Sequence, residues 1–272
     1  MDSTVLIENT AQEFWALTGG APSYPCDIKT VITWTLPLEV SAVPQLRIND
    51  VLAWTQRVNI TLRIQGRNRR LHGCLIAYRG KGTIFFDAND SEDEQRFTLA
   101  HELAHFLLDY QAPRQRAVTI LGASILPVLD GNRPPTHVER LHAVLSTVHL
   151  GVMSHVMERP DEGLPTNDVI DIEDRASRLA LELLAPVLPL CELMSSRATA
   201  RVAPTMTTGQ EDPYHSDRPE EPRGFSARLI FLTQHLTAEY GLPETVASSY
   251  ARYVLQQLGE PTFRDWLFHS AE

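Results

Sequence analysis

The fold is decided by residues 96–110, which read Arg-Phe-Thr-Leu-Ala-His-Glu-Leu-Ala-His-Phe-Leu-Leu-Asp-Tyr. His101 and His105 are four residues apart, so on a helix of about 3.6 residues per turn their directions differ by about 40°. Both imidazoles can therefore reach one metal ion. Glu102 projects from the neighbouring direction, where a carboxylate can act on a water beside the metal without binding the metal itself, as in zinc hydrolases.

A helix with two unlike faces is predicted around this motif, when residues are placed about 100° apart around its axis. The polar face holds Thr98, His101, Glu102, His105 and Asp109, and the apolar face holds Leu99, Ala100, Leu103, Ala104, Phe106 and Leu107. Ser91 and Glu94 have the spacing of a capping box at the start of this helix. The apolar face is predicted to pack on a core. The polar face carries the groups that a buried metal site needs, so we predict such a site there rather than a solvated surface.

Composition indicates an ordinary globular protein of 272 residues, 43% hydrophobic and 21% charged. The net charge of −10 argues against binding nucleic acid, which normally needs a basic patch. Residues 63–81 are locally basic, but their charges alternate with strand-forming residues, so we interpret them as a solvated sheet face. No direct contact with nucleic acid is expected.

The three cysteines, Cys26, Cys74 and Cys191, are far apart and form no Cys-x-x-Cys pair, so neither a disulfide framework nor a thiolate zinc site is predicted. No apolar run approaches the roughly 20 residues of a membrane span, and the first residues lack the pattern of a signal peptide. The sequence therefore favours a cytoplasmic protein with no membrane association.

An α+β fold is predicted, with a zincin-like core in which a three-stranded antiparallel sheet packs on the metal helix. The strands are expected at Ile60–Gln65, Leu71–Tyr78 and Thr83–Asp87, separated by short turn-like segments. An edge strand beside a metal can bind an extended peptide, which gives the strand that enters the metal helix a potential role. The predicted organisation is a mainly helical segment 1–56, a metallopeptidase core 57–192 with an insertion 111–168, a polar Pro-rich linker 193–224, and a C-terminal helical domain 225–272. Helices are expected at 11–17 and 48–56 in the first segment and at 225–236, 243–258 and 261–268 in the last, and the insertion is expected to begin as a loop rich in Pro and Gly.

Within the insertion, a helix is predicted from Val138 to Glu158. His142 and His149 are seven residues apart on this helix and so share one face. These two histidines and His155 are candidates for metal ligands or, together with Tyr110, for a donor that stabilises the transition state. The plain alternative is that they are surface or packed residues.

A catalytic zinc site needs a third protein ligand. The metzincin extension is excluded because Leu108 and Gln111 stand where its Gly and His would be. The later Glu of thermolysin-like enzymes is missing too, since residues 124–126 are Ser-Ile-Leu. The remaining carboxylates are Glu139, Glu158, Glu173 and Glu182. Glu182 lies among leucines, but Arg178 is placed to form an ordinary surface pair with it, so periodicity leaves the ligand and surface interpretations equal.

Residues 96–108 resemble the signature of the ImmA/IrrE family of bacterial metallopeptidases. Residues 173–186 resemble that family's second motif, in which an Ala-Asn pair precedes an Ala-x-Glu-Leu-Leu-x-Pro ending, with Ser177 in place of the Asn. The strands before the metal helix and residues 236–247 are similar as well. The resemblance implies that His101, His105 and Glu182 bind the metal and that Glu102 is catalytic.

By this resemblance the chain is expected to be a zinc-dependent endopeptidase, in which Glu102 takes a proton from the attacking water and passes it to the leaving amine. Two His and one Glu also accept Mn²⁺ or Fe²⁺. The family implies a cytoplasmic regulatory protease that cleaves a helix-turn-helix repressor in a stress or mobile-element response. Two alternatives are a metal-dependent sensor or scaffold that binds its partner without proteolysis, and a binding role for residues 225–272 with a structural metal.

Overall fold

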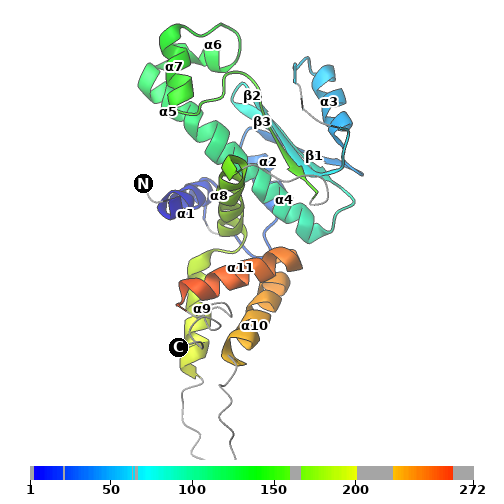
Figure 1. Cartoon of the computed structure of the whole chain (residues 1–272), viewed down its shortest axis with the longest axis vertical. Helices are drawn as coiled ribbons and strands as arrows, with labels where there is room; N and C mark the ends of the chain where they lie inside the picture. The colour runs from blue at the N-terminus through cyan, green and yellow to red at the C-terminus, as the bar shows by residue number, and fades with distance from the viewer. Residues whose placement is uncertain are drawn as a thin grey trace, which may run out of the picture. The chain divides into compact units, whose positions relative to one another are not determined.

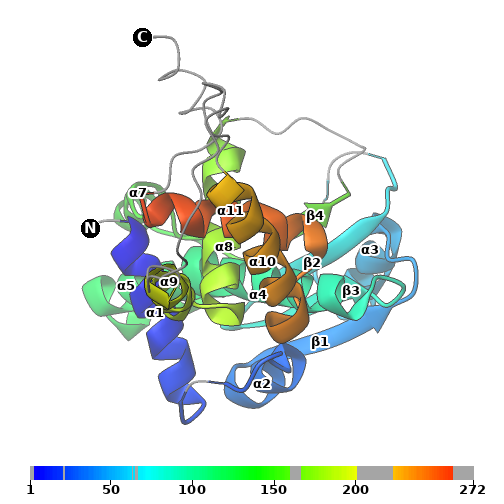
Figure 2. The ribbon, with the colours of Figure 1, turned by 90° about the horizontal axis from the view of Figure 1, so that it is seen from below.

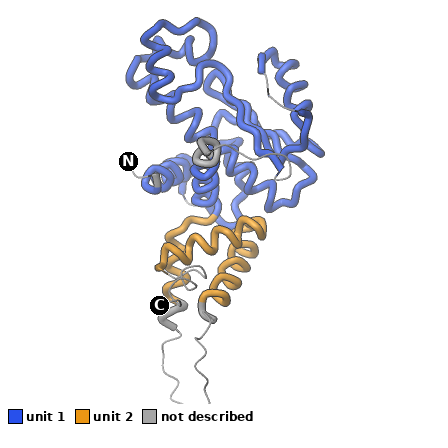
Figure 3. The backbone as a smooth tube through the Cα atoms, viewed as in Figure 1, with its two compact units in different colours: residues 1–184 blue, residues 185–272 orange. Residues whose placement is uncertain are grey.

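The structure, a computed structural model, describes residues 3–20, 22–62, 64, 67–159, 167–200 and 223–259. The chain divides into two compact units, residues 1–184 and residues 185–272 (Figure 3). The metal motif and the sheet both belong to the first unit, which is described first.

The sheet of the first unit has four strands in the order β1-β3-β2-β4. Their bounds are β1 (Leu38–Val43), β2 (Leu71–Tyr78), β3 (Lys81–Asp87) and β4 (Met153–Glu158). β1 is parallel to β3, whereas β2 is antiparallel to both β3 and β4. β1 and β4 are therefore the edges of the sheet (Figure 2). The α+β class is confirmed, but the predicted three-stranded antiparallel sheet is wrong, because the sheet is mixed and β3, which enters the metal helix, is internal.

Two of the strands were not predicted. β1 falls in the segment expected to be mainly helical, while the described residues of 60–64 form no strand. β4 falls in the stretch predicted as a helix from Val138 to Glu158. That helix ends early because Thr147 and Gly151 adopt left-handed backbone conformations, with φ of 51° and 93°, which an α-helix cannot accommodate.

Helices cover both faces of the sheet (Figure 1). The metal helix α4 (Glu92–His105) packs on one face and is crossed on its other side by α8 (Asn167–Leu184). α3 (Ile48–Arg57) packs on the opposite face in a core that contains Leu46, Ile48, Val51, Leu71, Cys74, Ile76 and Phe85. α1 (Ser3–Leu17) lies beside α8, and α2 (Ile28–Thr35) lies beside β1 and α4. The predicted helices at 11–17 and 48–56 are thus confirmed.

The first part of the insertion is helical rather than a loop. A π-helix η1 (Phe106–Gln111) leads from α4 into the insertion. The insertion itself contains α5 (Ala112–Leu121), a 3-10 turn η2 (Ala123–Ile125), α6 (Leu126–Leu129) and α7 (His137–Leu145). Pro113 and Pro127 suggested a loop, but each lies in the first turn of a helix, where the missing N–H costs no hydrogen bond. These helices enclose a small core of Ala117, Ile125, Val128, Leu129, Ala143 and Val148.

The second unit contains α9 (Val187–Ala200), α10 (Arg223–Tyr240) and α11 (Glu244–Gln257). α11 packs on both of the others, and the Tyr250 hydroxyl donates a 2.8 Å hydrogen bond to the carbonyl of Ala185. The predicted helices at 225–236 and 243–258 are confirmed. The helix predicted at 261–268 and residues 201–222 of the predicted linker lie outside the described residues.

No single helix in the described part of the chain is long and apolar enough to cross a membrane; α8 and α9 reach the required length and hydropathy only when taken together, as a bent pair.

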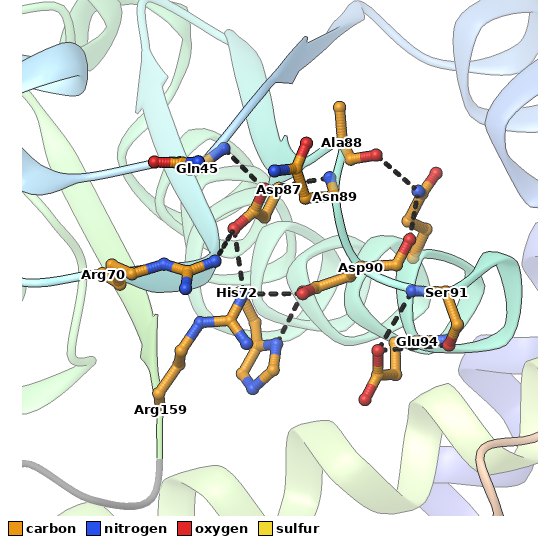
Figure 4. A network of polar contacts seen from close by, with 11 residues as sticks. Gln45, Arg70, His72, Asp87, Ala88, Asn89, Asp90, Ser91, Glu94 and Arg159 are labelled. Atoms are coloured by element: carbon orange, nitrogen blue, oxygen red, sulfur yellow. Dashed lines mark hydrogen bonds and ion pairs between the residues drawn. The ribbon is translucent and has the colours of Figure 1, made fainter.

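Asp87, at the end of β3, joins several segments of the first unit (Figure 4). Its fully buried carboxylate accepts hydrogen bonds from the backbone N–H groups of Gln45 and Asn89 and from the guanidinium groups of Arg70 and Arg159, at 2.8, 3.0, 3.2 and 2.9 Å. Arg159, just after β4, also pairs with Asp90 at 2.6 Å. The end of β4 is thereby tied to the turn that begins α4.

Replacing Asp87 by Asn tests this network. Burial alone would raise the pKa of Asp87, but the hydrogen bonds from Asn89, Arg70, Gln45 and Arg159 outweigh it and lower the pKa below 3.8. Asp87→Asn removes the charge that the two guanidinium groups share, so we expect a loss of about 3 kcal/mol in the free energy of unfolding at pH 7, measured by urea denaturation.

Because the pKa of Asp87 is lower in the folded than in the unfolded state, its stabilisation is complete above about pH 4 and disappears as the pH falls through the folded-state pKa. The difference in the free energy of unfolding between wild type and Asp87→Asn should therefore become smaller as the pH falls. Glu92→Gln, an exposed substitution in the same region, is the control and should change stability by less than about 0.5 kcal/mol. Equal stability of wild type and Asp87→Asn at pH 7 would contradict the assigned role.

Candidate metal centre

α4 buries the whole metal motif. His101, Glu102 and His105 are 3%, 0% and 1% exposed, and the two Nε2 atoms of the histidines lie 3.1 Å apart. The helix begins with the predicted capping box, since the Glu94 N–H donates to Ser91 Oγ and the Glu94 side chain accepts from the Ser91 N–H. The prediction of a buried polar face on a capped helix is confirmed.

α8 brings a third group to the two histidines. Glu173 Oε2 lies 3.0 Å from His101 Nε2 and 3.7 Å from His105 Nε2. One turn later on the same face of α8, Ser177 Oγ lies 3.4 Å from His101 Nδ1. The crossing of α8 over α4 therefore supplies both a carboxylate at the inner side of the histidine pair and a hydroxyl at its outer side.

The outer nitrogen of His105 also has a partner. Asp109 Oδ2 lies 2.8 Å from His105 Nδ1, and Asp109 Oδ1 lies 3.5 Å from Arg175 of α8. Asp109 belongs to the π-helix η1, a rare conformation that often occurs at functional sites. With a cation bound, hydrogens on the two Nδ1 atoms would face Asp109 and Ser177, and both Nε2 lone pairs would be free to face the cation.

His155 completes the cluster from β4. Its Nδ1 lies 2.9 Å from Glu102 Oε2, its Nε2 lies 2.7 Å from Glu173 Oε1, and its ring stacks on that of His105 with centroids 3.5 Å apart. The other oxygen of Glu102, Oε1, is buried and has no hydrogen-bond partner among the described residues. The motif glutamate is thus held through one of its two oxygens.

The charges of the cluster shift each other's pKa values. Burial would raise the pKa of Glu102, but the nearby His155, His105 and His101 lower it overall. Burial would likewise lower the pKa of His155, but Glu102 and Glu173 raise it to about 10. Burial lowers the pKa of His101, whereas hydrogen bonds to Asp109 and Glu173 raise that of His105 despite burial. Burial would raise the pKa of Glu173, but hydrogen bonds to His101, His105 and His155 lower it well below its usual range. Glu102 and Glu173 are therefore carboxylates at neutral pH.

The residues fit a divalent metal ion. Donor atoms of His101, His105, His155 and Glu173 all lie within 4.8 Å of one another. The distances of 3.0 to 3.7 Å among His101, His105 and Glu173 bracket the roughly 3.3 Å expected between ligands of a tetrahedral zinc with bonds of about 2.0–2.1 Å. A carboxylate and two inward-facing imidazole lone pairs are a donor set that such a cation accepts.

Glu182, the ligand expected from the family resemblance, does not belong to this cluster. It lies nine residues after Glu173 on α8, which corresponds to about 13.5 Å along the axis and the opposite face of the helix. α8 meets the histidines near its N-terminal end, because its buried stripe of Ala176, Leu179, Ala180 and Leu183 sets how it lies on its neighbours. The structure brings Glu173, and not Glu182, to the histidine pair.

The other two carboxylate candidates pair with arginines elsewhere, Glu139 with Arg133 at 2.7 Å and Glu158 with Arg69.

The three candidate transition-state donors also lie outside the cluster. The buried Tyr110 hydroxyl accepts a 2.8 Å hydrogen bond from the backbone N–H of Gly80. His142 lies on α7, with its Nε2 3.4 Å from Ser146 Oγ, and His149 follows that helix. His155, which shared the predicted helix with them, occupies the place beside Glu102 because its segment is a strand of the sheet.

Two of the groups around the histidines carried a signal in the sequence. Asp109 has the same spacing from His105 as His105 has from His101, which places all three on one helix face. Glu173 and Ser177 are likewise four residues apart. His155 was among the candidate histidines of the predicted helix, but no spacing distinguished it from His142 and His149, since its contact depends on the pairing of β4 with β2.

Two histidines and one carboxylate that can bind a metal, with a buried glutamate beside them, are the arrangement found in HExxH metal-dependent hydrolases. Residues 58–122 match the family model Peptidase_M78, described as the IrrE N-terminal-like domain. The match confirms the resemblance to the ImmA/IrrE family over the segment that carries the metal helix, and the family implies metallopeptidase activity. Among curated proteins, none matches the chain.

Gly73 of β2 permits the close approach of α4 to the sheet. A Cβ atom at this position would lie 2.5 Å from Thr98 Cγ2 and 3.2 Å from Glu102 Oε1. Gly73→Ala should therefore displace α4 and cost about 1–3 kcal/mol of stability, measured by thermal or urea unfolding. The double variant Gly73→Ala, Thr98→Ser removes the methyl group that clashes and should recover most of the loss. A fully stable Gly73→Ala protein would show that the contact is not tight.

Proposed function

We propose that the protein is a metal-dependent endopeptidase in which His101, His105 and Glu173 hold a divalent cation and Glu102 is the general base. One observation carries this proposal: Glu173 of α8 lies 3.0 Å from the histidine pair of α4, with Glu102 buried beside them. The match of residues 58–122 to Peptidase_M78 supports a peptidase rather than another hydrolase.

When bound, the cation supplies Lewis acidity and lowers the pKa of a water molecule toward about 7. Glu102 then accepts the proton of the attacking water at Oε1, the oxygen that has no hydrogen-bond partner among the described residues. The same carboxyl group delivers that proton to the leaving amine. Asp109 and Ser177 keep the two imidazoles in the orientation in which Nε2 faces the cation.

Zinc is the cation we propose, since a site of two histidines and one glutamate is typical of zinc peptidases, although Mn²⁺ and Fe²⁺ suit the same donors. We also propose a cytoplasmic location. Cys26, Cys74 and Cys191 are all free thiols, as in proteins of a reducing compartment.

We propose that the substrate is an extended segment of another protein. β4 carries His155 and is an edge of the sheet, paired with β2 on one side and with no strand of the described residues on the other. An edge strand beside the centre can hold a peptide through main-chain hydrogen bonds. The family resemblance supports a helix-turn-helix repressor as the substrate protein. It also supports a stress or mobile-element response as the process in which this repressor is cleaved.

Glu102→Gln tests catalysis separately from binding. We expect turnover to fall by about 10²–10⁴-fold, because the amide cannot accept the proton, while the metal content stays unchanged. Cleavage is measured on a fluorogenic peptide library by mass spectrometry, and metal content by elemental analysis. Unchanged turnover would exclude Glu102 as the base, and a wild-type protein that binds metal without cutting any peptide or candidate repressor would favour the sensor or scaffold function.

Glu173→Gln and Glu182→Gln form a matched pair on the same helix. Since only Glu173 meets the histidines, Glu173→Gln should weaken zinc binding by at least about 100-fold, which exceeds the loss typical of an outer partner. Glu182→Gln should retain wild-type affinity. Competition with a chromogenic chelator measures both. The reverse pattern would restore Glu182 as the ligand.

A further inference from the structure

We infer that His155 is a positioning residue that couples the general base to the metal ligand, by holding Glu102 with one ring nitrogen and Glu173 with the other. This inference rests on the proposed function, since it takes Glu173 as a ligand and Glu102 as the base. It assigns to a histidine on the sheet edge a role that the HExxH motif itself does not contain.

The two oxygens of Glu173 have different partners. Oε2 faces His101 and His105, at 3.0 and 3.7 Å, whereas Oε1 faces His155 Nε2 at 2.7 Å. Glu173 can therefore bind a cation through Oε2 without losing its contact to His155. A ligand carboxylate whose second oxygen accepts a hydrogen bond is fixed in orientation, and such outer partners contribute to metal affinity.

Glu102 is held in the same way from the other side of the imidazole ring. His155 Nδ1 lies 2.9 Å from Glu102 Oε2, which leaves Oε1 as the oxygen that accepts the proton. Each ring nitrogen of His155 thus faces a carboxylate oxygen, Nδ1 that of Glu102 and Nε2 that of Glu173. His155 is therefore assigned as a partner of the ligand shell and not as a fourth ligand, although one of its nitrogens lies within 4.8 Å of the other donors.

The backbone holds His155 firmly enough for this role. His155 pairs with Leu75 in the β2–β4 ladder, and its ring stacks on that of His105 with centroids 3.5 Å apart. Four residues later, Arg159 ties the end of β4 to Asp87 and Asp90 (Figure 4). The base on α4 and the ligand on α8 are thus aligned by a third element.

Two conservative variants separate the two contacts. The amide nitrogen of Asn reaches roughly the position of His Nδ1, and that of Gln reaches roughly the position of His Nε2. His155→Asn should keep the contact to Glu102 and lose that to Glu173, and His155→Gln should do the opposite. His142→Gln on α7, outside the cluster, is the control.

The experiment measures the Co²⁺ affinity of each holoprotein by chelator competition, its Co²⁺ absorption spectrum, and its kcat and KM on the fluorogenic peptide that the wild type cleaves best. His155→Asn should lose about 10–100-fold in metal affinity. His155→Gln should stay within about threefold of wild-type affinity but lose about 10–100-fold in kcat at unchanged KM, because its base is no longer aligned. His142→Gln should match wild type, and circular dichroism should show all variants folded.

Two results would overturn the inference: affinities and kcat of both His155 variants within twofold of wild type, or X-ray absorption showing three imidazole ligands in wild type and two in His155→Gln. If wild type itself binds no metal, the proposed function fails and this inference fails with it. If wild type binds metal and cleaves peptides while the His155 variants behave like wild type, the inference alone fails.

Discussion

The contact of Glu173 with His101 and His105 is the constraint on which the rest of the first unit depends. It places a carboxylate 3.0 and 3.7 Å from two buried imidazoles, next to a second, buried carboxylate. Such a group of polar side chains is costly away from water unless every member has partners. Here Asp109, Ser177 and His155 supply partners on the outside, and a cation at the centre would balance the two negative charges of Glu102 and Glu173.

Each layer of the unit contributes to that arrangement. Gly73 allows α4 to lie close against β2, and the Asp87 network fixes the turn from which α4 starts. The π-helix that follows His105 carries Asp109 to the outer nitrogen of the ring. β4, at the sheet edge, adds His155 between the two carboxylates. The centre is therefore built from three segments distant in sequence, α4 with η1, β4 and α8, and the HExxH motif belongs to only one of them.

The features that depend on neighbouring residues were predictable from the sequence. The capping box of Ser91 and Glu94, the buried polar face of α4, and strands β2 and β3 follow from local spacing. Glu173 was among the candidates, but its selection over Glu182 depends on where α8 crosses α4, which the periodicity of α8 does not determine. β4 was hidden because residues 138–158 have helical periodicity, whereas the chain turns at Thr147 and Gly151 into a strand whose partner is about 80 residues earlier.

We propose His101, His105 and Glu173 as the protein ligands of a catalytic metal ion. Anomalous diffraction from crystals of the zinc-loaded protein, recorded on both sides of the zinc edge, tests it most directly. The expected result is one strong peak about 2.0–2.2 Å from the Nε2 atoms of both histidines and from Oε2 of Glu173. A peak bound by Glu182 instead, or a zinc ion that touches none of the motif histidines, would contradict it.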